Sequence, residues 1–156
     1  MILYLDSSAL VKRYVAEVGS DQVNQVLAAA EMTGTAEITR VEVAAALARA
    51  VRVGALSPKR ATAALQEFRD HWFDSLHVQI SEMLVARADA LAWEHGLRGY
   101  DAVHLAAALT WQEALELPVV LATFDLPLWE TAGRVGLVAF PEDLRALMSR
   151  PRRRRA

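Results

Sequence analysis

Four acidic residues stand at positions where a folded chain would gather side chains for chemistry. Asp6 and Asp125 each follow a short apolar run, while Glu42 and Asp101 lie at the start of segments with helical character. Carboxylate oxygens are the ligands that hard divalent cations such as Mg²⁺ and Mn²⁺ prefer. A cation held in this way activates water and stabilises charge developing on a phosphate. The acids therefore favour metal-assisted phosphoryl chemistry.

The elements that would position these acids follow from an alternation of short apolar runs and helical segments. Strands are expected at residues 2–5, 34–39, 78–80, 118–123 and 136–140. Helices are expected at residues 9–15, 22–32, 39–53, 58–74, 81–95, 101–116, 126–132 and 141–148. This alternation predicts an α/β fold with a parallel sheet covered on both faces. Sites in such sheets form beyond the carboxyl ends of the strands, which is where Asp6 and Asp125 stand.

Each acid also has an ordinary structural explanation. An aspartate at a helix N-cap accepts a hydrogen bond from a free backbone N–H. Residues 39–42, Thr-Arg-Val-Glu, match the capping box, and Ser7 or Ser8 is expected to cap the helix over 9–15. Taken together, several carboxylates at one sheet edge repel one another and raise some of their pKa values. A bound cation offsets that repulsion, which favours the metal site over four unrelated caps.

Composition narrows the alternatives. The chain has 156 residues, enough for one domain, and 54% of them are hydrophobic. It has no cysteine, which excludes disulfides, thiolate zinc sites and cysteine nucleophiles. It has four histidines, so a three-histidine metal site would use nearly all of them. No apolar run approaches the ~20 residues that span a bilayer, and the opening residues lack a basic leader, so no membrane association and a cytoplasmic location are expected.

The net charge of −2 hides an uneven distribution. Five arginines lie between positions 150 and 155, and residues 1–149 alone carry a net charge of −7. We expect a folded domain over residues 1–148 and a flexible arginine-rich tail over 149–156. An acidic domain that handles nucleic acid needs something to offset its negative charge, and a divalent cation would do so.

Several of these segments together resemble a known family. Residues 3–8 (LYLDSS), Glu42, residues 98–108 (RGYDAVHLAAA) and residues 121–125 (LATFD) are similar, in order and spacing, to PIN domains. More narrowly, they resemble VapC-type toxins of toxin–antitoxin pairs, and the likeness runs from about residue 2 to residue 140.

The resemblance implies a PIN-like three-layer fold with a short central parallel β-sheet flanked by helices. It implies an endoribonuclease that depends on Mg²⁺ or Mn²⁺, hydrolyses RNA, pairs with an antitoxin protein and forms a homodimer. By the same likeness, Asp6, Glu42, Asp101 and Asp125 are the catalytic, metal-binding acids. Ser8 and Thr123 would support them through their hydroxyls.

Four further residues are candidates for substrate contact. His104 follows Asp101 by three positions, so it shares a helix face with Asp101 and would either orient a carboxylate or contact RNA. Arg98 precedes the acidic helix start and would meet a phosphate. Lys12 and Arg13 lie past the turn at Asp6. The alternative for each is ordinary: a structural histidine, a solvated loop arginine, and a solvated helix face.

Two other functions remain open at this point. The first is an aspartyl-phosphate phosphatase or receiver-like domain with Asp6 as nucleophile. Such phosphatases usually have a second aspartate two residues on, where this chain has Ser8, and they need a lysine near the phosphate, whereas Lys12 and Lys59 follow no expected strand. The second is a catalytically silent metal- or RNA-binding module in which the acids are only caps.

Overall fold

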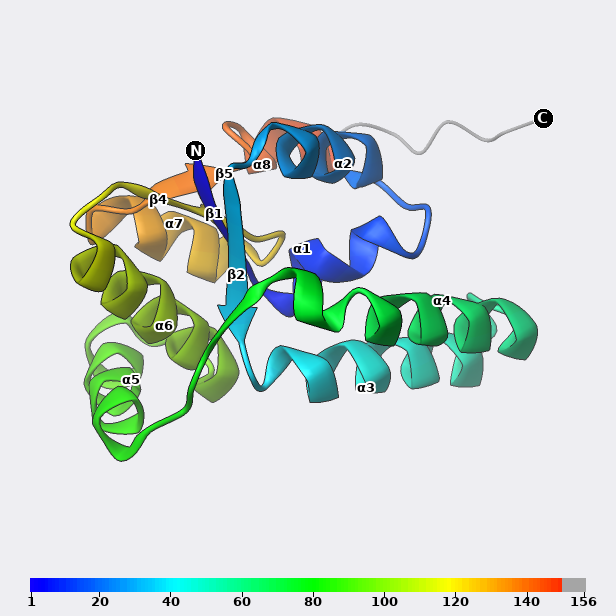
Figure 1. Cartoon of the computed structure of the whole chain (residues 1–156), viewed down its shortest axis with the longest axis horizontal. Helices are drawn as coiled ribbons and strands as arrows, with labels where there is room; N and C mark the ends of the chain where they lie inside the picture. Colours follow the sequence, from blue (N-terminus) through cyan, green and yellow to red (C-terminus); the bar gives the residue numbers. More distant parts are fainter. Residues whose placement is uncertain (150–156) are drawn as a thin grey trace.

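A five-stranded parallel sheet forms the centre of the computed structural model, which describes residues 1–149. The strands lie in the order β3-β2-β1-β4-β5 (Figure 1). Their bounds are β1 Ile2–Leu5, β2 Met32–Ala36, β3 Leu76–Val78, β4 Val119–Ala122 and β5 Val138–Phe140. The predicted α/β fold with a short parallel sheet between helical layers is confirmed.

Helices connect the strands and cover both faces of the sheet. The helices are α1 Ser7–Leu10, α2 Ser20–Ala29, α3 Thr39–Arg52, α4 Pro58–Asp70, α5 Glu82–His95, α6 Gly99–Leu115, α7 Leu126–Arg134 and α8 Leu144–Ser149. Short 3₁₀ turns follow α1 (η1, Val11–Arg13) and α4 (η2, Trp72–Asp74). Ser149 thus belongs to α8, and the tail predicted to be flexible otherwise lies outside the described residues.

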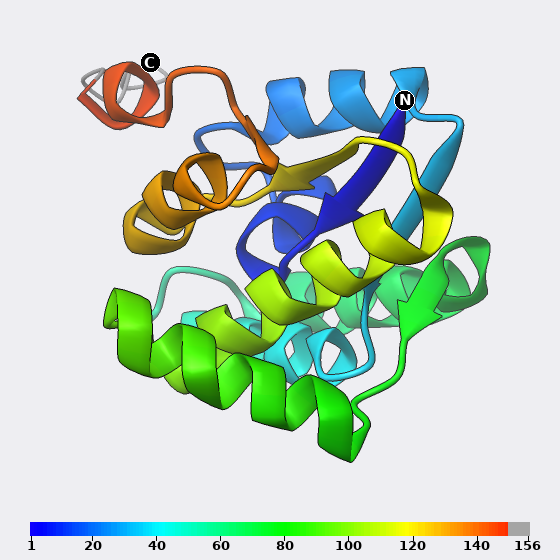
Figure 2. The ribbon, with the colours of Figure 1, turned by 90° about the vertical axis from the view of Figure 1, so that its left-hand side faces the viewer.

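Alternation along β1 divides the apolar interior into two cores. Ile2 and Tyr4 point to one face, where α5, α6 and α7 pack, and α5 and α6 run side by side across it (Figure 2). Leu3 and Leu5 point to the other face and join residues of α1, α2, α3 and α4. Successive side chains of a strand face opposite sides, so one four-residue strand anchors both helical layers.

One glycine sets the distance between a helix and the sheet. Gly34 in β2 lies beneath the Trp111 ring of α6, and a Cβ at residue 34 would approach that ring to 2.7 Å. The glycine therefore lets α6 lie close to the sheet, and α6 is the helix whose first turn carries Asp101.

In two helices, α1 and α3, the N-terminal cap differs from the predicted one. Asp6, and neither Ser7 nor Ser8, caps α1 by accepting from the Ala9 amide. The capping box at 39–42 is not formed, because Ile38 is the N-cap residue of α3 and the Thr39 hydroxyl hydrogen-bonds Thr35 instead. Glu42 is consequently free of any capping role.

Element ends differ from the predicted ones by a few residues. The segment expected as one helix over 9–15 is a single α-turn followed by η1, and the helix expected over 22–32 ends at Ala29 because Met32 already pairs in β2. The helix expected to start at residue 101 starts at Gly99. Within residues 1–149, no helix is both long enough and apolar enough to cross a membrane.

Candidate active site

The four predicted acids gather at the carboxyl end of the sheet. Asp6 follows β1, Asp125 follows β4, Glu42 lies in the first turn of α3, and Asp101 lies in the first turn of α6. All four line one pocket of about 710 Å³. Its other lining residues are Ser7, Ser8, Val85, Ala88, Asp89, Ala92, Arg98, Gly99, Tyr100, Val103 and Phe124.

Asp6 is the most enclosed of the acids, with 2% of its surface exposed. Its Oδ1 accepts from the Ser8 hydroxyl at 2.7 Å and from the Ala9 amide at 2.8 Å, and its Oδ2 accepts from the Thr123 hydroxyl at 2.6 Å. Burial raises the pKa of Asp6, while the hydrogen bonds from Thr123, Ser8 and Ala9 lower it. Hydrogen bonds to the charged form thus offset part of the cost of burying the carboxylate.

Ser8 and Thr123 hold Asp6 with hydroxyls that are themselves oriented by the backbone. The Phe124 amide donates to the Ser8 Oγ at 2.8 Å, and the Asp125 amide donates to the Thr123 Oγ1 at 3.1 Å. Each hydroxyl accepts from the turn after β4 and donates to the acid after β1. The structure therefore ties the ends of two neighbouring strands together through Asp6.

Arg98 bridges the two acids on the other side of the pocket. Its Nε lies 2.8 Å from Asp101 Oδ2 and its Nη2 lies 2.5 Å from Asp125 Oδ2, while its side chain remains 76% exposed. Desolvation raises the pKa of Asp101, the hydrogen bond from Arg98 lowers it, and the charge of Asp125 raises it. Asp125 also caps α7 by accepting from the Leu128 amide.

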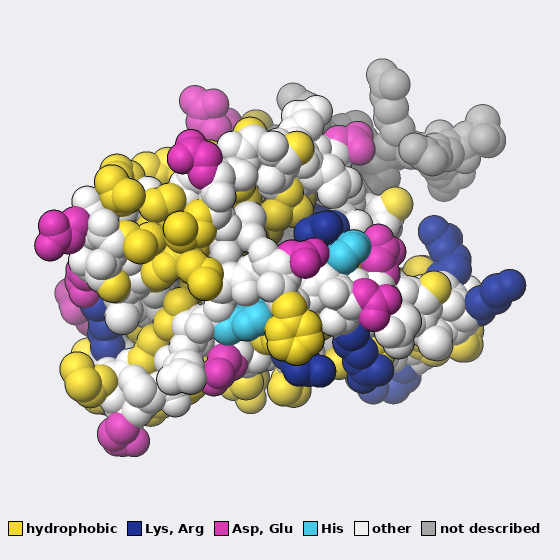
Figure 3. Space-filling view, viewed as in Figure 1, with side chains coloured by type: hydrophobic (Ala, Val, Ile, Leu, Met, Phe, Trp, Pro, Cys, Tyr) yellow, Lys and Arg dark blue, Asp and Glu magenta, His cyan; other side chains and the backbone are white. Residues whose placement is uncertain are grey.

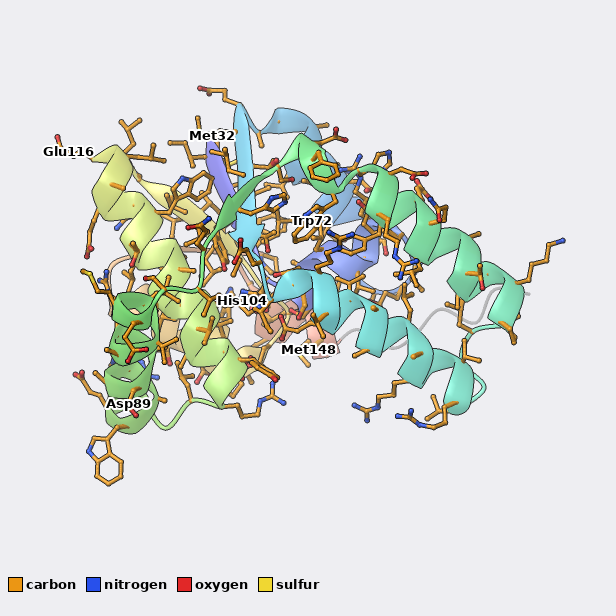
Figure 4. All side chains as sticks on the ribbon, turned by 60° about the horizontal axis from the view of Figure 1, so that its bottom comes forward. Met32, Trp72, Asp89, His104, Glu116 and Met148 are labelled. Carbon is orange, nitrogen blue, oxygen red and sulfur yellow. The ribbon has the colours of Figure 1, made fainter. Side chains whose placement is uncertain are left out.

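Glu42 is held by a buried histidine. Nε2 of His104 lies 2.7 Å from Glu42 Oε2, and the Nδ1 of the same ring lies 2.9 Å from the Tyr4 hydroxyl. Figure 4 shows His104 between α6 and the first turn of α3. Because His104 is only 1% exposed, the RNA contact predicted for it is not available, and its contact with Glu42 matches the other predicted role, that of orienting a carboxylate.

The donor chemistry of the pocket suits a hard cation. The acids supply only oxygen ligands, and the negative charge between Asp101 and Asp125 is already compensated by a cation, the Arg98 guanidinium. Within residues 1–149, no three acidic or histidine side chains are grouped closely enough to share one ion. Asp6, Glu42, Asp101 and Asp125 are nevertheless the carboxylates that face one pocket, and Asp101 and Asp125 could bind a cation only after Arg98 has released them.

Lys12 and Arg13 do not line the pocket, and the substrate contact predicted for them stays a prediction. The Lys12 Nζ pairs with Glu17 at 2.8 Å and lies over the Phe124 ring, and its side chain is mostly buried. Arg13 lies on Tyr14 at the far side of η1. Both basic residues lie in η1, which continues the single turn of α1, and Phe124, the ring beneath the Lys12 ammonium, is itself a pocket residue.

The apolar side of the pocket was missed by the sequence analysis. Val85, Ala88 and Ala92 of α5 and Val103 of α6 line it. The spacing of 85, 88 and 92 is the i, i+3, i+7 pattern of one helix face, so a signal was present, but it does not distinguish a pocket wall from buried core. Tyr4 was missed as well, because it reads as an ordinary apolar strand residue.

The sequence and the fold match those of known proteins. The family model of the PIN domain matches residues 3–132. The chain belongs to the PIN domain family. A curated PIN relative, Ribonuclease VapC45 of Mycobacterium tuberculosis, is 32% identical over 143 residues, which cover 92% of this chain and 97% of the relative.

Two solved structures share the PIN fold at lower sequence identity. PAE2754 from Pyrobaculum aerophilum superposes with a TM-score of 0.62 at 20% identity, over 96% of this chain and 91% of that one. A toxin–antitoxin complex from Klebsiella pneumoniae superposes with a TM-score of 0.54 at 20% identity, over 76% and 83% of the two chains. At such identity the likeness concerns the fold alone.

Proposed function

We propose that this PIN domain is a divalent-cation-dependent endoribonuclease that acts as the toxin of a toxin–antitoxin pair. The observation that carries the proposal is the convergence of Asp6, Glu42, Asp101 and Asp125 on one pocket at the carboxyl end of the sheet. The relatedness to a VapC ribonuclease over nearly the whole chain supports the same activity.

In this proposal Asp6, Glu42, Asp101 and Asp125 would hold Mg²⁺ or Mn²⁺, which would supply activation of water and stabilisation of charge on the scissile phosphate. The chain's own residues bind and orient. Ser8 and Thr123 favour the charged form of Asp6 and fix its orientation, since both donate to its carboxylate. Arg98 balances Asp101 and Asp125 in the metal-free protein, and its exposed guanidinium is placed to contact a phosphate when it leaves them.

A group of exposed basic side chains outside the acidic pocket suits a substrate with many phosphates, such as RNA. Residues 43–66 contain no acidic residue, and Arg49, Arg52, Lys59 and Arg60 are all exposed. They lie at the end of α3 and the start of α4, where Figure 3 shows a group of Lys and Arg side chains at the tip of the helix pair. Within residues 1–149 none of the four forms a salt bridge, so they are available to phosphates.

A protein partner and a second copy of the chain complete the proposal. The Klebsiella pneumoniae structure is described as a toxin–antitoxin complex, and we extend that partnership to this chain. Met83 and Trp93 of α5 are 85% and 92% exposed, and large exposed apolar side chains of this kind mark protein interfaces. We propose that the chain forms a homodimer, and a cytoplasmic location remains a prediction.

The aspartyl-phosphate alternative is not favoured. The second aspartate that such phosphatases usually have two residues on is replaced by Ser8, whose hydroxyl donates to the Asp6 carboxylate. Of the two lysines, Lys12 pairs with Glu17 and Lys59 lies in the first turn of α4. The alternative of a catalytically silent metal- or RNA-binding module predicts no cleavage of RNA.

The test is cleavage of labelled tRNA, rRNA and mRNA by the purified chain. We expect cleavage with Mg²⁺ or Mn²⁺ that stops when EDTA is added. Asp101→Asn should reduce the rate by orders of magnitude, whereas Asp21→Asn, on the exposed first turn of α2, should not. Cleavage that continues undiminished in EDTA, or that Asp101→Asn leaves unchanged, would overturn the proposal.

A further inference from the structure

A chain of buried hydrogen bonds leads from the centre of the sheet to the pocket. The Tyr4 hydroxyl lies 2.9 Å from His104 Nδ1, and His104 Nε2 lies 2.7 Å from Glu42 Oε2. Tyr4 and His104 are both fully enclosed, and the two rings meet edge to face with centroids 5.9 Å apart. The three residues come from β1, α6 and α3, so the chain connects three separate elements.

The positions of the protons follow from hydrogen-bond satisfaction. A carboxylate only accepts, so the proton on the Glu42 side belongs to His104 Nε2. Within residues 1–149 the Tyr4 hydroxyl has no side-chain acceptor other than His104 Nδ1. If Nδ1 carried a proton, the buried phenol would have nowhere to donate, at a substantial free-energy cost. The arrangement in which Tyr4 donates to Nδ1 and Nε2–H donates to Glu42 leaves neither group unsatisfied.

In this arrangement the two carboxylate oxygens of Glu42 have different partners. Oε2 accepts from His104, while Oε1 accepts from no side chain within residues 1–149. A glutamate has several rotatable bonds, and fixing it for ligand binding costs conformational entropy. A carboxylate already held through one oxygen incurs less of that cost when the other oxygen binds a cation.

We propose that His104 and Tyr4 are positioning residues for Glu42. His104 holds the Glu42 carboxylate at the pocket through Nε2–H, and Tyr4 holds the imidazole ring in that orientation. Glu42 thereby offers Oε1 to the cation. The inference rests on the proposed function, because it gives the carboxylate a cation to bind.

Calorimetric titration of the metal-free chain with Mn²⁺ tests this proposal without any RNA. Outer hydrogen-bond partners of metal ligands typically contribute about 10–100-fold in metal affinity, so His104→Leu should weaken Mn²⁺ binding by about that factor. His104→Gln should recover part of the loss, because its amide can donate to Glu42. Tyr4→Phe should give a smaller loss. Tyr14→Phe is the matched control, since Tyr14 packs on Phe68 away from the pocket, and it should change nothing.

A double-mutant cycle separates positioning from a general structural role. If His104 acts through Glu42, His104→Leu should have no further effect on Mn²⁺ affinity in a Glu42→Gln background. An equal loss in both backgrounds would overturn the positioning role. Melting in chelator checks that each variant folds, and Tyr4→Phe and His104→Gln keep the question answerable if His104→Leu does not.

Nitrogen NMR of the histidine rings provides a second readout. We expect the metal-free wild-type chain to show His104 protonated on Nε2 and unprotonated on Nδ1, and a proton on Nδ1 would contradict the proposal. Two different results of the Mn²⁺ titration would overturn the two proposals. No Mn²⁺ binding by the wild-type chain would overturn the proposed function together with the positioning role. Mn²⁺ binding that is uncoupled from His104 would overturn the positioning role alone.

Discussion

In the metal-free protein, ionisation of Asp101 lowers the free energy of unfolding. Desolvation raises its pKa above the ordinary value of 3.8, and the attraction of Arg98 only partly offsets this. A carboxyl with a raised folded-state pKa contributes stability below its unfolded pKa, and that contribution is lost as the pH rises through the folded pKa. The residue lies inside the first turn of α6, whose N-cap is Arg98, so it has no capping role to lose.

Asp101→Asn should therefore stabilise the metal-free chain at neutral pH. The gain in melting temperature over wild type should be smallest near pH 3.8 and grow as the pH rises above it, because only the wild type then acquires the buried charge. Thermal melts in EDTA across pH 4–8 measure this. Asp89→Asn, which removes an exposed carboxylate from the same pocket, is the control. A loss of stability in Asp101→Asn that grows with pH would contradict the prediction.

Arg98 should compete with the cation for Asp101 and Asp125. Its two ion pairs must open before a metal takes those oxygens, and exposed pairs of this kind are worth about 0.2–1 kcal/mol each. Since about 1.4 kcal/mol corresponds to tenfold in affinity, the loss of both pairs in Arg98→Ala should tighten Mn²⁺ binding by about 2- to 30-fold.

Calorimetric titration again supplies the measurement. Arg87→Ala is the matched control, because Arg87 forms a bidentate pair with Glu113 outside the pocket. It should leave Mn²⁺ affinity unchanged. Weaker binding in Arg98→Ala would mean that Arg98 organises the acids for the cation and does not compete with it.

At the scale of the elements, the approach of α6 to β2 decides where the site is built. A Cβ at Gly34 would lie 2.7 Å from the Trp111 ring, which is buried and has little room to move. Overpacking of this kind costs about 1–3 kcal/mol, so Gly34→Ala should lower the free energy of unfolding by about that amount.

Denaturant unfolding with and without the substitution measures the effect. Gly133→Ala in α7 is the control, since a Cβ there meets no atom within 4 Å, and it should be stabilising by about 0.5–1 kcal/mol because alanine favours the helix. Equal behaviour of the two variants would show that α6 can shift away from the sheet without cost.

The elements also show what the sequence could and could not predict. The strand ending at Leu5 was predictable because an apolar run meets Asp6, and the end of α5 because Gly96 adopts a left-handed conformation. The cap of α1 was assigned to the wrong residue, because Asp6, Ser7 and Ser8 are all good caps and only the packing decides between them.

The site was predictable as a set of acids but not as a geometry. Asp6 and Asp125 follow strands, and parallel strands place such residues at one edge. The contact of His104 with Glu42 joins residues 62 positions apart, and it depends on how α3 and α6 pack at the end of the sheet. The ion pair of Arg98 with Asp125 depends in the same way on the neighbouring starts of α6 and α7.

At the scale of the whole molecule, charge is distributed unevenly between the folded domain and the tail. Residues 1–149 carry a net charge of −7, and five arginines follow between positions 150 and 155. Among the described residues, both hydrophobic cores are built from residues between Ile2 and Phe140. The five arginines that follow add positive charge to a chain whose first 149 residues are negatively charged.

Removal of residues 150–156 should leave the melting temperature unchanged and weaken RNA binding chiefly at low salt. For single-stranded RNA the logarithm of affinity falls with the logarithm of salt concentration by about 0.7 per phosphate neutralised. If all five arginines contact phosphates, truncation should make that slope shallower by up to about 3.5. Fluorescence anisotropy of a labelled RNA over a range of KCl concentrations, with EDTA present to prevent cleavage, measures the slope.

A chain in which Gly and Ser replace residues 150–156 is the control, because it retains the length and loses the charge, and it should match the truncated chain. Equal slopes for the full and truncated chains would mean that the tail makes no contact with RNA, while a large drop in melting temperature would mean that it packs on the folded domain.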